Sequence, residues 1–112
     1  MKILCICNQG ENRSKTAAVL IRQSGRHEVR YDGFYKEKYI EKEKRWEKFA
    51  PGNLEWAEKI IVFEEQHEEE LKKLDYACWG KSINFNIPDK YYFDQPELIK
   101  LVKEKIDLFD LG

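Results

Sequence analysis

The sequence has no long apolar run, no surplus of either charge and no cysteine pair at a metal-binding spacing. No apolar segment approaches the roughly 18–20 residues of a membrane-spanning helix. Lys and Arg total 20 against 21 for Asp and Glu, a net charge of −1 that gives no general attraction to nucleic acid or membranes. Lys2 is followed by only five apolar residues before Asn8, which is not a signal-peptide pattern, so we expect a cytoplasmic protein.

Cysteine is also scarce. Three cysteines are an odd number, and in a reducing compartment we expect them to be free thiols. Cys5 and Cys7 are spaced C-x-C rather than C-x-x-C, and only Cys78 remains, so we expect no metal site. Cys5 lies on the same side of a predicted strand as Cys7, where packing is its expected role, and Cys78 is expected to be an ordinary thiol.

The chain does have alternating strand and helix patterns over one domain, residues 1–112. Strands are predicted at 3–7, 26–31, 59–63 and 81–87, and helices at 14–23, 35–49, 64–74 and 94–109. Such alternation predicts right-handed crossovers and a parallel sheet that is covered on both faces. Ligands of these sheets bind at the carboxyl ends of the strands.

The second predicted helix, at 35–49, is predicted only from the spacing of residues along one helical face. Its face is formed by residues at i, i+4, i+7, i+11 and i+14, namely Tyr35, Tyr39, Lys42, Trp46 and Phe49. The charges of 36–48 are of mixed sign, which favours a solvated face over a basic interaction patch. Pro51 and Gly52 break this helix, and Asn53 is predicted to cap a short helical piece after them. In the next helix, His67 is predicted to be a half-buried packing residue.

The segment around the first predicted strand contains a nucleophile, a loop and a helix start. The strand ends at Cys7, a polar loop with Gly10 and Asn12 follows, and a helix begins at Arg13 and Ser14. Loop amides and a helix N-terminus carry positive partial charge and attract anions. Glycine, and less easily asparagine, allow the positive φ angles that turn amides inward. The segment therefore predicts an anion-binding loop.

The side chains of this loop suit phosphoryl chemistry. Helix N-terminal amides and a nearby arginine favour the thiolate, which is the nucleophilic form of cysteine. The planar guanidinium of Arg13 matches the positions of two phosphate oxygens. The Ser14 hydroxyl can donate to the Cys7 thiolate when that thiolate is the leaving group. The alternative is a buried strand cysteine beside a surface arginine, which the Cys-x5-Arg-Ser context disfavours.

Three stretches of the sequence resemble low-molecular-weight protein tyrosine phosphatases. Ile6-Cys-Asn-Gln-Gly-Glu-Asn-Arg-Ser14 resembles the phosphate loop of this family. Residues 55–67 resemble its third strand and following helix, and Ile87-Pro-Asp-Lys-Tyr-Tyr92 resembles the loop that carries the general acid. The pattern is similar to a short branch of predicted bacterial and archaeal phosphatases. The resemblance implies a three-layer α/β/α fold with a four-stranded parallel sheet in the order 2-1-3-4 and the phosphate loop after strand 1.

The resemblance also implies a mechanism without a metal or an organic cofactor. Cys7 would be the nucleophile and form a phosphocysteine intermediate, Arg13 would bind the transferred phosphoryl group, and an aspartate would protonate the leaving oxygen. The other expected substrate-binding residues in the loop are Asn8, Gln9, Gly10, Glu11, Asn12 and Ser14. The sequence departs from the family at Gly10, where asparagine is frequent, at Lys15, where proline is common, and in its shorter length.

Two aspartates are candidates for the general acid. Asp94 and Glu97 have the spacing of a capping box, in which helix amides stabilise the charged carboxylate. Asp89 directly follows the end of the fourth predicted strand and is followed by aromatic residues, as in the family. We therefore predict Asp89 as the acid. Tyr91 and Tyr92 are expected either to form a wall of the pocket or to be ordinary core or surface aromatics.

The predicted function is hydrolysis of a phosphate ester, either protein phosphotyrosine or an aryl phosphate. A small-molecule, nucleotide or RNA-end phosphate stays open, because the loop contacts only the phosphoryl group. Arsenate reductases share the fold and the loop but need two further cysteines downstream of the nucleophile, and only Cys78 is available here. Phosphotransferase-system carriers keep phosphate on a cysteine and lack the loop arginine, so Arg13 and Asp89 favour hydrolysis. A catalytically weak module that binds phosphate or a phosphoprotein is a further alternative.

Overall fold

Four parallel strands form the central sheet of the computed structural model, which describes residues 1–35, 38–40, 44–47 and 52–112. The strands are β1 (Lys2–Cys7), β2 (Glu28–Gly33), β5 (Lys59–Val62) and β6 (Ser82–Asn84). Their order in the sheet is β2-β1-β5-β6, and all three neighbouring pairs are parallel. The predicted order 2-1-3-4 of the four parallel strands is therefore confirmed.

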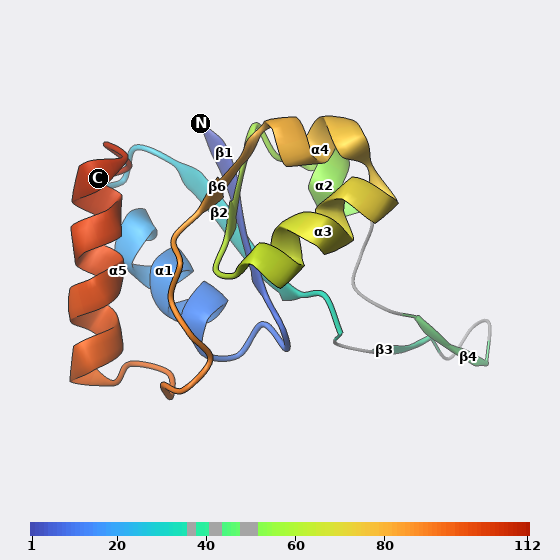
Figure 1. Cartoon of the computed structure of the whole chain (residues 1–112), viewed down its shortest axis with the longest axis horizontal. Coiled ribbons are helices and arrows are strands. Elements are labelled where there is room, and N and C mark those ends of the chain that lie inside the picture. The colour runs from blue at the N-terminus through green and yellow to red at the C-terminus, as the bar shows by residue number, and fades with distance from the viewer. Residues whose placement is uncertain (36–37, 41–43, 48–51) are drawn as a thin grey trace.

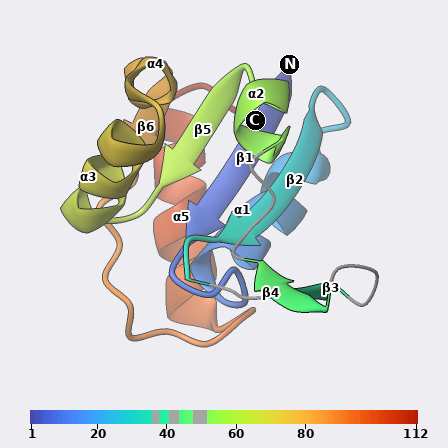
Figure 2. The ribbon, with the colours of Figure 1, turned by 90° about the vertical axis from the view of Figure 1, so that its right-hand side faces the viewer.

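Helices cover both faces of this sheet (Figures 1 and 2). One face carries α1 (Arg13–Arg22) and α5 (Pro96–Leu108). The other carries α2 (Gly52–Trp56), α3 (Glu65–Leu74) and α4 (Tyr76–Gly80). The predicted three-layer α/β/α architecture is confirmed. No helix among the described residues has the length and apolar character needed to cross a membrane.

Strand β1 is buried on both faces, as the central strand of a parallel sheet should be. Cys5 and Cys7 pack with the core under α1 and α5, whereas Leu4 and Ile6 pack with the core on the other face. Cys78 belongs to that second core. All three cysteines are free thiols, and burial raises the pKa of both Cys5 and Cys78.

The predicted helix at 35–49 is wrong, because its described part is a β-hairpin. Strands β3 (Lys38–Ile40) and β4 (Arg45–Glu47) pair antiparallel, with Tyr39 opposite Trp46. A separation of seven residues fits two turns of a helix and also the two sides of a short hairpin, and aromatic residues favour strands. The rest of the predicted helix, at 36–37, 41–43 and 48–49, lies outside the described residues.

Both predicted capping residues have other contacts. The Asn53 side chain donates to Asp32 Oδ2 and accepts from Arg30, and it lies inside α2 rather than before it. Helix α5 begins at Pro96, with Gln95 as its N-cap. Asp94 has φ +62° and precedes that cap, so the capping box is wrong. Proline is pre-organised for the first helical position, which moves the helix start beyond the carboxylate.

Helix α4 was not predicted. Its start is capped by Asp75, whose Oδ1 accepts from the backbone N–H of Ala77 at 3.0 Å. The helix is five residues long, too short to show an apolar periodicity in the sequence. A capped helix of five residues can be recognised only when its packing against α3 is known.

Candidate active site

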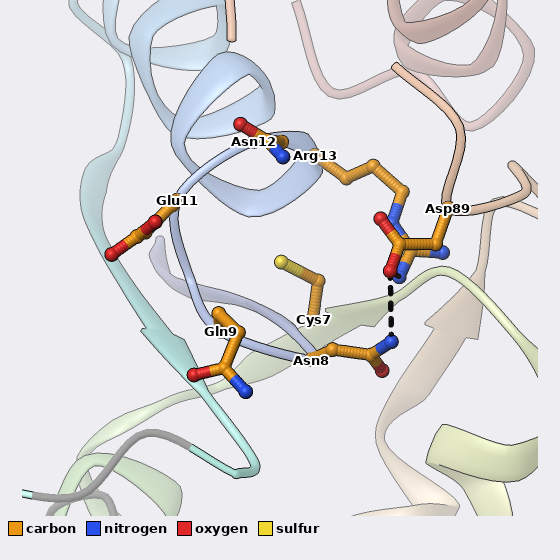
Figure 3. A pocket seen from close by; sticks show the side chains of 7 residues that line it. All are labelled: Cys7, Asn8, Gln9, Glu11, Asn12, Arg13 and Asp89. Carbon is orange, nitrogen blue, oxygen red and sulfur yellow. Dashed lines mark hydrogen bonds and ion pairs between the residues drawn. The ribbon is translucent and has the colours of Figure 1, made fainter. Parts of the chain in front are cut away.

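A small pocket lies at the carboxyl end of β1, where the chain turns into α1 (Figure 3). Its volume of about 100 Å³ is below the range of roughly 300–1,000 Å³ that is usual for drug-sized ligands. The residues that line it are Cys7, Asn8, Gln9, Glu11, Asn12, Arg13 and Asp89. The pocket thus brings together the predicted nucleophile, arginine and acid, which are up to 82 positions apart along the chain.

The loop between β1 and α1 is held against the end of β2 by its backbone. Gly10 has φ +73°, and a Cβ atom there would lie 2.7 Å from the carbonyl carbon of Asp32. A Cβ atom at Gly33 would lie 2.3 Å from the carbonyl carbon of Gln9. The backbone N–H of Phe34 also donates to the carbonyl oxygen of Cys7 at 2.8 Å. Glycine is therefore required at both contact points, and the loop has little freedom to move.

The Cys7 thiol is almost fully buried, and the loop curves around its sulfur (Figure 3). Its Sγ lies 3.2 Å from Oγ of Ser14, which is also buried. A serine hydroxyl at this distance can donate to a cysteine thiolate. Ser14 and Gly10 do not line the pocket itself, so their predicted contact with substrate is indirect in this structure.

The Arg13 side chain is 1% exposed, which is unusual for arginine, and it is held from several directions. Its Nη1 donates to the carbonyl oxygen of Ile87 at 2.7 Å, and Glu64 Oε2 lies 3.3 Å away. Its Nε is buried and has no partner among the described residues. The guanidinium is thus fixed in the pocket with a donor left for an anion. Glu64 was not among the predicted site residues, although it lies in the 55–67 stretch.

The two candidate acids occupy different places. The Asp89 carboxylate lies in the pocket and is about half-exposed; its Oδ2 accepts from Asn8 Nδ2 at 3.1 Å and lies 3.9 Å from Arg13 Nη2. Asp94 is exposed and does not line the pocket, and its backbone N–H donates to Thr16 Oγ1 at 3.3 Å. Only Asp89 is therefore within reach of a group bound to Cys7.

The two tyrosines after Asp89 border an adjoining hollow rather than the pocket itself. Together with Asn12, Asp89 and Lys90 they line a space of about 190 Å³. Tyr91 is half-buried and packs against the core, whereas Tyr92 is 79% exposed. Asn12 also ties this loop to the loop between β1 and α1, because its Oδ1 accepts from the backbone N–H of Phe93 at 3.1 Å.

His67 is more deeply buried and more strongly bonded than predicted. It is 0% exposed, packs against Phe34, accepts from the backbone N–H of Phe63 at Nδ1, and has Nε2 2.7 Å from Asn8 Oδ1. Burial, and secondarily the charge of Arg13, lowers the pKa of His67 to about 4. The ring is therefore neutral at pH 7. The prediction of a half-buried packing residue missed the link between His67 and the loop that joins β1 to α1.

The polar groups of the pocket suit an anion. The buried Arg13 guanidinium lines the pocket, which lies at the N-terminus of α1. Helix N-termini attract anions. Among the residues that the structure describes, no group of three His, Cys, Asp or Glu side chains could hold a metal ion.

Comparison with known proteins finds similar solved structures but no matching family model or curated sequence. No family model matches the sequence, and no curated protein matches it significantly. The tyrosine phosphatase Wzb from Escherichia coli K30, solved with phosphate, is 20% identical, with a TM-score of 0.77 over 99% of this chain and 98% of that one. Wzb from Vibrio vulnificus, solved with benzylphosphonate, is 21% identical, with a TM-score of 0.76 over 96% and 95% of the two chains. The YwlE arginine phosphatase from Geobacillus stearothermophilus is 20% identical, with a TM-score of 0.67 over 98% and 95%.

Proposed function

We propose that this chain, which has the fold of the low-molecular-weight phosphatases, is a cysteine-dependent phosphatase that forms a phosphocysteine on Cys7. The observation that carries the proposal is the convergence of three groups in one pocket. The Cys7 thiol and the Asp89 carboxylate line the same small space at the N-terminus of α1. The buried Arg13 also lines it, and its Nε has no partner among the described residues. These are the nucleophile, the oxyanion donor and the proton donor that phosphoryl transfer requires.

The first step transfers the phosphoryl group to sulfur. The Cys7 thiolate attacks phosphorus, the S–P bond forms and the bond from phosphorus to the ester oxygen breaks. Asp89 gives its proton to that leaving oxygen. Arg13 and the loop amides bind the equatorial phosphoryl oxygens, where charge is spread in the transition state.

The second step releases phosphate. A water molecule attacks the phosphorus of phosphocysteine and passes a proton to the Asp89 carboxylate, and the S–P bond breaks. The Ser14 hydroxyl, 3.2 Å from Cys7 Sγ, donates to the departing thiolate. Inorganic phosphate leaves, and both Cys7 and Asp89 return to their starting states.

The substrate class is a phosphate ester, with protein phosphotyrosine or an aryl phosphate as the leading candidates. The similar structures include proteins named as tyrosine phosphatases and others named as arginine phosphatases, so a phosphoarginine belongs among the substrates to be tested. Small-molecule, nucleotide and RNA-end phosphates belong there too, because a pocket of about 100 Å³ contacts little beyond the phosphoryl group. We place this activity in the cytoplasm.

A panel of these phosphate compounds, assayed for release of inorganic phosphate, tests the proposal. Wild type should release phosphate from at least one member, and Cys7→Ser should release none. Cys78→Ser is the matched control, because Cys78 is a buried thiol in the other core, and this variant should keep wild-type activity. Stable phosphorylation of Cys7 without release would instead indicate a carrier. Binding of a phosphate compound without release of phosphate and without phosphorylation of Cys7 would indicate a phosphate-binding module.

A further inference from the structure

A chain of hydrogen bonds runs from the end of β5 to the Asp89 carboxylate. The backbone N–H of Phe63 donates to His67 Nδ1 at 3.1 Å, and His67 Nε2 lies 2.7 Å from Asn8 Oδ1. Asn8 Nδ2 in turn donates to Asp89 Oδ2 at 3.1 Å (Figure 3). The chain thus connects a buried strand end, the phosphate loop and the candidate acid.

The backbone N–H of Phe63 determines which group donates in every later bond of the chain. A backbone N–H can only donate, so His67 Nδ1 accepts, and the neutral ring must carry its proton on Nε2. That proton is donated to Asn8 Oδ1, with Glu64 Oε2 also nearby at 3.4 Å. Because its oxygen is occupied by His67, the Asn8 amide turns its NH2 group towards Asp89. His67 therefore prevents the amide from flipping and presenting oxygen to the carboxylate.

This orientation distinguishes the two oxygens of Asp89. Oδ2 faces a group that can only donate, so a proton on a neutral Asp89 must be on Oδ1. Arg13 Nη2 lies 3.9 Å from Oδ2, which is beyond hydrogen-bond distance. Its charge attracts the Asp89 carboxylate but does not fix the orientation of that carboxylate. The Asn8 bond is the directional contact that restrains a carboxylate which is itself 48% exposed.

We propose that His67 and Asn8 are positioning residues that hold Asp89 so that Oδ1 delivers the proton to the leaving group. This inference rests on the proposed phosphatase function. His67 acts through Asn8, and Asn8 acts through Asp89, so neither needs to contact the substrate's leaving group. The role of His67 is then to fix an amide rotamer rather than to transfer a proton.

Leaving-group dependence separates this role from a merely structural one. An activated leaving group, such as p-nitrophenolate, needs less protonation than phenolate, so loss of the acid affects phenyl phosphate more. Asn8→Ala should lower kcat/KM for phenyl phosphate at least roughly tenfold more than for p-nitrophenyl phosphate, within the range that a general acid contributes. Asp89→Asn should show the same selectivity, and the double variant should lose little more than Asp89→Asn alone.

The controls use other bonds of the same kind. Asn84 Nδ2 donates to Glu68 Oε2 at 3.0 Å outside the pocket, so Asn84→Ala removes an equivalent bond and should resemble wild type. His67→Gln keeps an amide that can donate to Asn8 and should retain more phenyl phosphate activity than His67→Phe. The inhibition constant of inorganic phosphate should stay unchanged in His67→Phe, because His67 does not line the pocket proposed to bind the phosphoryl group.

The possible failures are distinguishable. An equal loss for both esters in Asn8→Ala, or a loss that adds to that of Asp89→Asn, would overturn the positioning role and leave the phosphatase function standing. Release of phosphate from no member of the panel by wild type, or hydrolysis that survives Cys7→Ser, would overturn the proposed function and this inference with it.

Discussion

The two sides of the pocket are held in different ways. The cradle, which we define as residues 8–13, is fixed by backbone packing against β2 and by a fully buried arginine. The acid loop, residues 88–95, is mostly exposed and is tied to the cradle by single hydrogen bonds at Asp89 and Phe93. The pocket thus pairs a rigid half, which we propose binds the phosphoryl group, with a lightly restrained half that carries the proposed proton donor.

Because of this difference, we expect substitutions in the two halves to have different effects on stability and on activity. Changes in the cradle should lower the free energy of unfolding as well as activity, because the same contacts that shape the loop also pack it against β2. Changes in the acid loop should lower activity and leave stability nearly unchanged, because few buried contacts are lost there. Each of the following experiments tests one side of that division.

The largest expected effect is on catalysis in the acid loop. Asp89→Asn removes the proton donor and should lower kcat/KM for phenyl phosphate by about 10²–10⁴-fold, with an unchanged unfolding midpoint. Asp94→Asn is the matched control: Asp94 is exposed, lies outside the pocket and has a positive φ that asparagine tolerates. Asp94→Asn should change neither kcat/KM for phenyl phosphate nor the unfolding midpoint. Selective loss of turnover in Asp94→Asn would transfer the role of acid to that residue.

The next effect concerns the stability of the cradle. Gly10→Ala adds a Cβ that overlaps the Asp32 backbone, which costs about 1–3 kcal/mol, and also suffers the strain of positive φ, about 1–2 kcal/mol. Gly25→Ala has the same φ strain, at +71°, with nothing within 4 Å. In denaturant titrations Gly10→Ala should therefore be the less stable of the two variants. Equal stabilities would mean that the cradle is not held by this contact.

The third effect is the pH dependence of stability contributed by His67. Its pKa in the folded state is lowered to about 4, against an ordinary value of 6.5, so the unfolded chain takes up the proton first. The stability of wild type relative to His67→Gln should thus fall as the pH drops from 6.5 to 4 and then level off. At about 1.4 kcal/mol per pKa unit, the change is about 3 kcal/mol. A difference that does not vary with pH would contradict the neutral, Nε2-protonated ring.

The cradle could be predicted from sequence because its parts are contiguous. A buried strand, a cysteine, a glycine-containing loop and a helix start follow one another within residues 3–14, and each has a local signature. The sheet order followed from the alternation of strands and helices together with the resemblance. The hairpin was missed because the separation of Tyr39 from Trp46 fits a helix equally well, and the Asp94 cap was wrong because Pro96 sets the start of α5.

The restraints on the acid could not be predicted in the same way. Asn8 and His67 are 59 residues apart, and Asn8 and Asp89 are 81 apart, so their contacts exist only once β1, β5 and β6 are side by side. The orientation of the Asn8 amide depends further on which nitrogen of His67 carries the proton. A histidine on an apolar helix stripe gives no sign of that in sequence, because the deciding contact is a backbone N–H of the preceding strand end.

The central claim is that phosphate passes through Cys7, and trapping the intermediate tests it most directly. Wild type and Asp89→Asn, mixed rapidly with p-nitrophenyl phosphate and quenched in denaturant within one turnover, can be mapped by peptide mass spectrometry. The phosphoryl group should be on the peptide that contains Cys7, at up to one per chain, and should be absent in Cys7→Ser. Phosphate released without a phosphorylated Cys7, or a phosphoryl group on another residue, would contradict the account.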